Sequence, residues 1–169
     1  DPKLRSQVDQ LWDKLWTGGL SNPLDAIEQL SYLLFLKRLD DEENRRAKQA
    51  KLRQTTYKAR VSKEMRWSHW TQMQAAEALK HVRDTVFPWL RELGGDKVEE
   101  SSFARYMQNA EFKINKPNLL IEACKLIDQM DIAAQNQDIQ GDLFEYLLSH
   151  LDQAGRNGQF RTPRHIIRL

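Results

Sequence analysis

The residues that follow Asn22 and Pro23 have the pattern of a helix that is apolar on nearly every side. Asn22 is a residue type that caps helices, Pro23 suits the first helical position, and Asp25 places an acid in the first turn. The large apolar side chains beyond them occupy several faces: Leu30, Tyr32, Leu33, Leu34, Phe35, Leu36 and Leu39. Because a helix that is apolar all round must be buried, the sequence predicts a central helix surrounded by other helices.

Two blocks of charge follow this apolar segment. Residues 40–43 read Asp-Asp-Glu-Glu, so we expect the far end of the helix to leave the core, as a solvent-facing helix or a mobile segment. Residues 45–66 then hold nine basic residues against one acid, Glu64. This basic strip is a candidate for phosphate contact, and the alternative is a solvated helix face with an exposed loop. Its members are Arg45, Arg46, Lys48, Lys51, Arg53, Lys58, Arg60, Lys63 and Arg66.

Further helices are predicted from apolar spacing and from breaker residues. Residues 4–16 carry a stripe of Leu4, Val8, Leu11, Trp12 and Leu15, and Gly18-Gly19 ends that helix. Residues 72–93 form another, which Pro88 should kink or divide. A short helix is expected to about residue 107 after Ser101-Ser102, and a longer one over residues 117–130. Asp138 could cap a last helix whose buried stripe is Leu143, Phe144, Leu147, Leu148 and Leu151.

Five tryptophans are many for one small domain. Residues 66–70, Arg-Trp-Ser-His-Trp, read as a loop with two large anchors, Trp67 and Trp70. Aromatic side chains are common interface anchors, although burial in the core explains most of them without further assumption. We expect part of the tryptophan and phenylalanine inventory to form a protein interface.

The bulk properties exclude several classes of protein. The chain has 169 residues, 40% of them hydrophobic, which suits a single domain with a core. The longest apolar run, residues 32–36, is far too short to cross a bilayer, and no signal segment is evident, so we expect a cytoplasmic protein. The single cysteine, Cys124, should be a buried core thiol. The four histidines lack metal-site spacing, so no metal is expected, and no nucleophile motif surrounds any Ser, Asp or His, so no catalytic residue is expected.

The segment near residue 160 combines several residues with special backbone demands. Gly155 and Gly158 allow a helix to stop and reverse, Thr162 suits a helix N-cap, and Pro163 suits the first helical position. Free backbone N–H groups at such a helix start favour the binding of a carboxylate or a phosphate. A simple turn between two helices is the alternative.

Residues 158–167, Gly-Gln-Phe-Arg-Thr-Pro-Arg-His-Ile-Ile, follow Gly-Asp-Leu-Phe-Glu-Tyr-Leu-Leu at residues 141–148. Together they resemble the start of the catalytic domain in modification subunits of type I restriction-modification systems, which are adenine-N6 DNA methyltransferases. Residues 11–16, 33–38, 66–67 and 87–88 are similar to the helical N-terminal domain of that family. The resemblance implies an S-adenosylmethionine pocket lined by Gln159, Phe160, Arg161, Thr162, Pro163 and Arg164, although the family commonly has an aromatic residue where Arg161 stands.

Two strings that such a methyltransferase needs do not occur in the chain. They are the Gly-rich turn of the Asp/Asn-Pro-x-Gly-x-Gly type, which approaches the cofactor, and the Asn/Asp-Pro-Pro-aromatic element, which holds the adenine amine. We therefore expect an N-terminal fragment of a larger enzyme that is inactive alone and binds S-adenosylmethionine negligibly.

The predicted architecture is all-α. Residues 1–135 should form a multi-helix N-terminal domain, and residues 136–169 a connecting helix and the start of a truncated methyltransferase domain. The resemblance implies double-stranded DNA, a specificity subunit, a second modification subunit and a restriction subunit as partners, and no membrane. Since the target base must be flipped out, something must hold the rest of the duplex, and the helical domain is a plausible clamp and docking unit. The alternatives are a freestanding helical nucleic-acid-binding regulator and a structural protein-interaction module.

Overall fold

The computed structural model describes residues 2–20, 22–95, 107–135, 140–143, 145–147 and 149. Within these ranges all regular structure is helical and no strand is present, which confirms the predicted all-α class. The α-helices are α1 (Pro2–Thr17), α2 (Pro23–Leu52), α3 (Trp67–Trp70), α4 (Ala75–His81), α5 (Phe87–Gly95) and α7 (Pro117–Gln129). Shorter helical elements are η1 (Lys63–Met65), η2 (Val82–Val86) and η3 (Ile132–Ala134).

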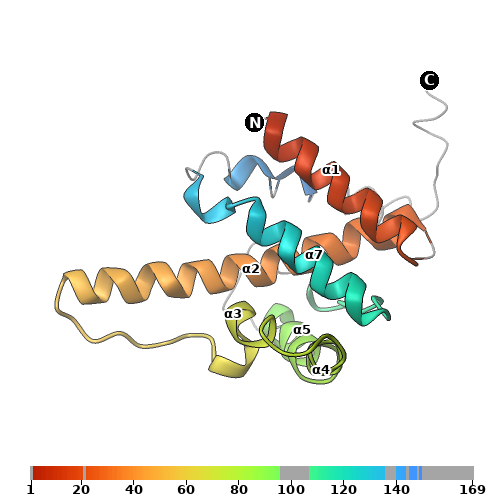
Figure 1. Cartoon of the computed structure of the whole chain (residues 1–169). Coiled ribbons are helices and arrows are strands. Elements are labelled where there is room, and N and C mark those ends of the chain that lie inside the picture. Colours follow the sequence, from red (N-terminus) through yellow and green to blue (C-terminus); the bar gives the residue numbers. More distant parts are fainter. Residues whose placement is uncertain are drawn as a thin grey trace.

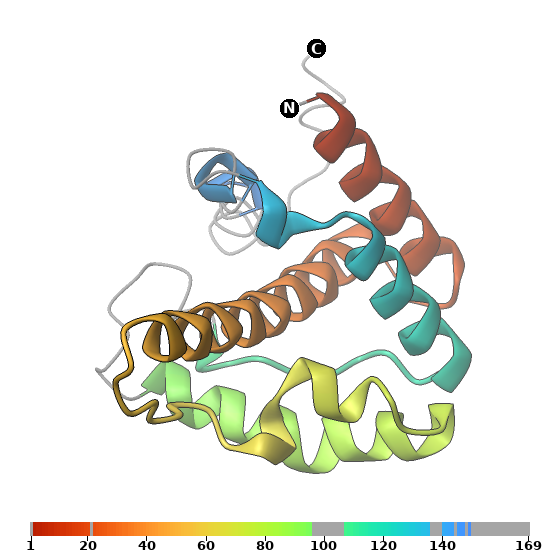
Figure 2. The ribbon, with the colours of Figure 1, turned by 60° about the vertical axis from the view of Figure 1, so that its left-hand side comes forward.

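Helix α2 is the centre of the fold, as the sequence predicted. Figures 1 and 2 show α1 and α7 on one side of it and the α4–α5 segment on the other. Every residue from Leu30 to Leu36 is buried, because neighbouring helices cover all faces of this segment. The predicted cap is also confirmed, since the Asn22 side chain accepts a hydrogen bond of 2.8 Å from the Asp25 amide. The C-terminal part of α2 extends beyond the other helices (Figure 1).

Helix α1 packs on α2 and α7 through the predicted stripe. Leu4, Val8, Leu11 and Leu15 are buried. The turn that follows requires glycine at two positions. A Cβ on Gly18 would lie 2.7 Å from the Cδ1 atom of Leu119 in α7, and Gly19 has a φ of +134°, which side chains rarely adopt. The Gly18-Gly19 pair therefore lets α1 end in close contact with α7.

The predicted helix over residues 72–93 is present, but the chain accommodates Pro88 differently from the prediction. Instead of a break, α4 continues through a π-helical turn, η2, directly into α5. Pro88 lies at the second position of α5, where its missing N–H falls just after the widened turn. The wider turn thus accommodates the proline without dividing the segment.

Residues 66–70 differ from the predicted loop. Residues 67–70 form the short helix α3, and both anchors are buried as expected, with Trp67 at 2% and Trp70 at 0% exposure. Their rings lie edge to face with centroids 5.1 Å apart. The Trp67 indole also donates a hydrogen bond of 3.0 Å to Asp128 in α7. These contacts fix the point at which the chain returns to the core after the basic strip.

The segment before α7 is tied to α2 by a buried amide. Gln29, fully buried, donates from Nε2 to the Glu111 carbonyl (2.8 Å) and accepts from the Lys113 amide (3.0 Å). Helix α7 begins at Pro117, as predicted. Helical residues between 140 and 149 lie against α1, where Arg5 stacks on the Tyr146 ring at 5.3 Å. Leu143 and Leu147 are buried as predicted, whereas Asp138 and the helix expected after Ser101 lie outside the described residues.

Cys124 is a buried core thiol, as predicted. It is 2% exposed, and burial raises its pKa well above the ordinary value. Both effects slow reaction with alkylating agents, because the thiolate is the reactive form. We expect Cys124 to resist alkylation in native buffer and to react fully in denaturant. Labelling followed by mass spectrometry checks this, and rapid labelling of Cys124 in the native protein would contradict its placement in the core.

Candidate nucleic-acid interface

The basic strip begins in the protruding end of α2 and continues through a returning segment, residues 53–66, here called the strap. Two buried carboxylates on α2 hold the strap in place. The first is Asp40, which is 2% exposed. Its Oδ1 atom accepts hydrogen bonds from Arg66 Nε at 2.7 Å and from Ser68 Oγ at 3.1 Å. Arg66 also donates from Nη2 to Asn44 Oδ1 at 2.6 Å, so its guanidinium group closes the end of the strap onto α2.

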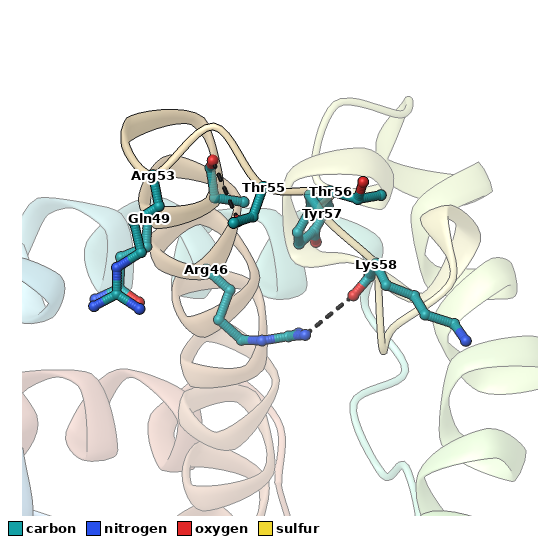
Figure 3. A pocket seen from close by; sticks show the side chains of 8 residues that line it. Arg46, Gln49, Arg53, Thr55, Thr56, Tyr57 and Lys58 are labelled. Atoms are coloured by element: carbon teal, nitrogen blue, oxygen red, sulfur yellow. Dashed lines mark hydrogen bonds between the residues drawn. The ribbon is translucent and has the colours of Figure 1, made fainter.

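The second carboxylate is Glu43, which is also 2% exposed. It accepts hydrogen bonds from Arg46 Nη1 at 3.0 Å, from the Arg60 amide at 3.1 Å and from the Tyr57 hydroxyl. Arg46 additionally donates to the Lys58 carbonyl at 3.0 Å (Figure 3). Glu43 therefore holds the middle of the strap directly through Tyr57 and Arg60, and indirectly through Arg46, which binds the Lys58 carbonyl.

These contacts correct the prediction for residues 40–43. The helix does continue toward solvent, but Asp40 and Glu43 do not leave the protein interior. Their burial is possible because arginine, hydroxyl and amide donors satisfy them, which offsets the cost of removing a carboxylate from water. Only Glu42 of this block is exposed, and Asp41 pairs with Lys37 at 2.6 Å.

The nine predicted phosphate contacts divide into two groups. Three arginines bind protein carboxylates: Arg45 with Glu42, Arg46 with Glu43, and Arg66 with Asp40. The other six are exposed and form no ion pair with any residue that the structure describes. They are Lys48 and Lys51 on α2, Arg53 at its end, Lys58 and Arg60 on the strap, and Lys63 in η1. The structure thus brings the exposed cations together around one protrusion, while their role toward DNA stays a prediction.

A solvent-open hollow lies between the end of α2 and the strap. It is lined by Arg46, Gln49, Ala50, Arg53, Thr55, Thr56, Tyr57 and Lys58. Figure 3 shows Gln49 on α2 beside Arg53, which directly follows the end of α2, while Lys58 extends away on the strap. A second hollow adjoins it, lined by residues that include Lys63, Arg66 and His69. The first hollow is mainly polar and basic, which suits a negatively charged polymer better than an apolar ligand, whereas the lining of the second also includes Ala59 and Val61.

Hydrogen bonds at this end also set the protonation of two groups. The bond to Glu43 raises the pKa of Tyr57, because ionisation of the phenol would remove the donor and place a second negative charge beside the carboxylate. The bond from Arg45 lowers the pKa of Glu42. Tyr57 therefore remains a neutral donor to Glu43 at physiological pH, and Glu42 remains charged.

The remaining sequence predictions have mixed outcomes. Residues 159–164, the expected cofactor contacts, lie outside the described residues. The described residues contain no group of three or more His, Cys, Asp or Glu that could hold a metal ion. His69 and His81 do lie together, with ring centroids 6.2 Å apart, and His81 Nε2 is 2.7 Å from the Glu64 carbonyl. In the described part of the chain no helix has the length and apolar character to span a membrane.

The tryptophans are not all buried, which keeps the interface prediction open. Trp12 and Trp89 are half-buried, and Trp16 is 46% exposed. Sequence reasoning did not find the positioning residues Asp40, Glu43 and Tyr57. The only signal for Asp40 and Glu43 was that they belong to a block of acids on the same helix as the first arginines of the strip. It also did not single out Leu52, which is 76% exposed at the end of α2.

Comparison of the sequence with known proteins shows the family of the chain. The chain is 28% identical over 166 residues to the "Type I restriction enzyme EcoEI methylase subunit" of Escherichia coli. The alignment covers 89% of this chain and 32% of that protein, so the chain spans about a third of the length of this curated relative. No solved structure matches the chain significantly. Residues 4–128, which include α2, the strap and nearly all of α1 and α7, match the family described as "HsdM N-terminal domain", and the chain belongs to this family.

Proposed function

We propose that this chain is the DNA-clamping and subunit-docking domain of a type I restriction-modification methyltransferase, which methylates adenine N6 in duplex DNA with S-adenosylmethionine. The single observation that carries the clamping role is the protrusion formed by α2 and the strap. It presents six exposed cations, the four acids of residues 40–43 on α2 are buried or paired, and Glu64 is the one acid of the strap. Such a surface can neutralise phosphates without reading bases.

The rest of the proposal concerns the parts that complete the enzyme. Residues 1–135 form the helical domain, and residues 136–169 connect it to the methyltransferase domain, where residues 159–164 contact S-adenosylmethionine. A specificity subunit reads the target sequence, and a second modification subunit and a restriction subunit complete the assembly. Exposed aromatic surface such as Trp16 is available for docking. The cytoplasm, where bacterial DNA lies, is the compartment in which this function operates.

A charge-removal variant tests the clamping role. In the full-length modification subunit assembled with its specificity subunit, Lys48, Lys51 and Arg53 are replaced together by serine. We expect DNA affinity to fall by about tenfold or more, and equally for cognate and non-cognate duplexes, because phosphate contacts carry no sequence information. These three positions avoid Arg46 and Arg66, whose guanidinium groups bind protein carboxylates.

A matched control removes the same number of exposed cations elsewhere. Lys80 on α4, Lys116 just before α7 and Lys125 on α7 are exposed, and serine at these positions should leave DNA affinity within about twofold of the parent. Equal loss in both variants would indicate a general charge effect and not a clamp at α2. No loss in either would favour the alternative of a structural interaction module.

A further inference from the structure

The end of α2 presents one large apolar side chain among cations. Leu52 is 76% exposed, the largest exposed fraction among the exposed large hydrophobic residues of the described chain. From residue 44 to residue 56 the other side chains are cations, amides, threonines and alanines. Single exposed leucines are ordinary on protein surfaces, so exposure alone carries no meaning. Leu52 is distinguished by being the last residue of α2. The C-terminal part of this helix is basic and protrudes beyond the other helices (Figure 1).

The turn that carries Leu52 is held by backbone hydrogen bonds. The Arg53 amide donates to the Gln49 carbonyl at 2.9 Å, the Gln54 amide to Lys51 at 3.3 Å, and the Thr55 amide to Ala50 at 2.9 Å. Gln54 has a φ of +56°, which turns the chain sharply into the strap. With the strap fixed to Glu43 and Asp40, Leu52 is presented from a constrained turn and cannot fold back onto the core.

The charges around Leu52 indicate which class of molecule it contacts. Lys48, Lys51 and Arg53 are its nearest charged neighbours in sequence, and no acid occurs from residue 44 to residue 63. Binding to an apolar protein surface would remove water from these cations without compensation. A DNA duplex instead offers phosphates that the cations can bind, and base edges in its grooves that the leucine can contact. Apolar side chains that enter a DNA groove beside phosphate-bound cations are an established mode of DNA contact.

We infer that Leu52 enters a groove of the bound duplex and contacts bases, between phosphates that Lys48, Lys51 and Arg53 bind. This inference rests on the proposed clamping function and adds an apolar contact to it. The lysine and arginine contacts depend on salt, and the leucine contact does not, because it releases no counterion. The two kinds of contact are therefore separable by experiment.

The first test replaces Leu52 with serine in the full-length subunit assembled with its specificity subunit. We expect a loss of DNA affinity of about tenfold, since burying a leucine is worth at least this factor and groove deformation offsets part of it. The slope of log K against log salt should stay that of the parent. Leu24→Ser is the matched control, because Leu24 is 42% exposed on the first turn of α2, at the opposite end of the helix. The DNA affinity of this variant should equal that of the parent.

The second test locates the contact directly. Leu52→Cys should form a disulfide, by thiol–disulfide exchange that releases a small thiol, with a duplex whose bases carry tethers activated as mixed disulfides in the groove, and Leu24→Cys should not. The parent protein, whose Cys124 is buried, gives the background. Absence of the crosslink together with unchanged affinity of Leu52→Ser would overturn the inference, while the proposed clamp would stand if serine at Lys48, Lys51 and Arg53 still weakens binding. Loss of specificity-subunit assembly in Leu52→Ser would also overturn it, because the leucine would then dock a protein.

Discussion

Replacing Asp40 with alanine is expected to destabilise the protein by about 3 kcal/mol. The substitution leaves the Arg66 guanidinium, 21% exposed, without its carboxylate, and it leaves Ser68 without its acceptor. Breaking a buried ion pair on one side is costly because the remaining charge stays partly desolvated. Urea unfolding followed by tryptophan fluorescence measures the change, since Trp67 and Trp70 lie in α3, the helix that directly follows Arg66.

Two further variants separate charge from hydrogen bonding. Asp40→Asn keeps an acceptor and should cost roughly 1–2 kcal/mol. Glu42→Ala removes an acid from the same end of α2, but its pair with Arg45 is 48% exposed on each side chain, so the loss should be under about 1 kcal/mol. If Asp40→Ala costs no more than Glu42→Ala, the buried pair does not hold the strap.

Replacing Glu43 with alanine should release the middle of the strap and weaken DNA binding at the same time. Three donors, from Arg46, Tyr57 and Arg60, are left without their shared acceptor, and we expect about 2–3 kcal/mol of destabilisation. The Arg60 amide should lose its protection from hydrogen exchange, because its acceptor is Glu43 Oε2. Lys58 and Arg60 are then no longer held in position, so DNA affinity should fall severalfold.

The direction of this affinity change discriminates between two explanations. Removing an acid makes the protein more positive, so net charge alone predicts tighter DNA binding by Glu43→Ala. Positioning of the strap predicts weaker binding. Glu42→Ala removes the same charge one residue away and leaves the strap attached, so it should bind DNA as tightly as the parent or more tightly. Equal tightening in both variants would show that Glu43 does not position the cations.

The local features of the fold could be predicted from sequence. The stripe of α1, the Asn22 cap and the apolar centre of α2 follow from helical spacing and capping chemistry, which depend on neighbouring residues. The burial of Asp40 and Glu43 could not be predicted in this way, because their partners Arg66 and Tyr57 are 26 and 14 residues away. A run of acids has the same local sequence pattern whether its carboxylates bind distant donors or water, so the pattern does not reveal burial.

The same distinction explains two smaller differences. Residues 67–70 read as a loop, yet α3 forms because Trp67 and Trp70 pack into the core and Trp67 binds Asp128 of α7. The chemistry of Pro88 alone predicts a kink or break in the helix. The π-helical turn before it changes the backbone hydrogen-bond pattern, so that the helical segment continues past the proline. For the candidate site, composition identified the basic strip. Only the structure separates the arginines that bind protein carboxylates from the cations that remain exposed.

The salt dependence of DNA binding tests the central claim most directly. In the assembled full-length enzyme, log K is measured against log salt for the parent, for the serine variant at Lys48, Lys51 and Arg53, and for the control at Lys80, Lys116 and Lys125. Removing one phosphate-bound cation should reduce the slope by about 0.9, so the slope should fall by up to about 2.7 in the first variant and stay unchanged in the control. An unchanged slope in the first variant would make the strip a solvated face, and a weakening confined to the cognate duplex would mean that it reads sequence. Either result would contradict the proposed clamp.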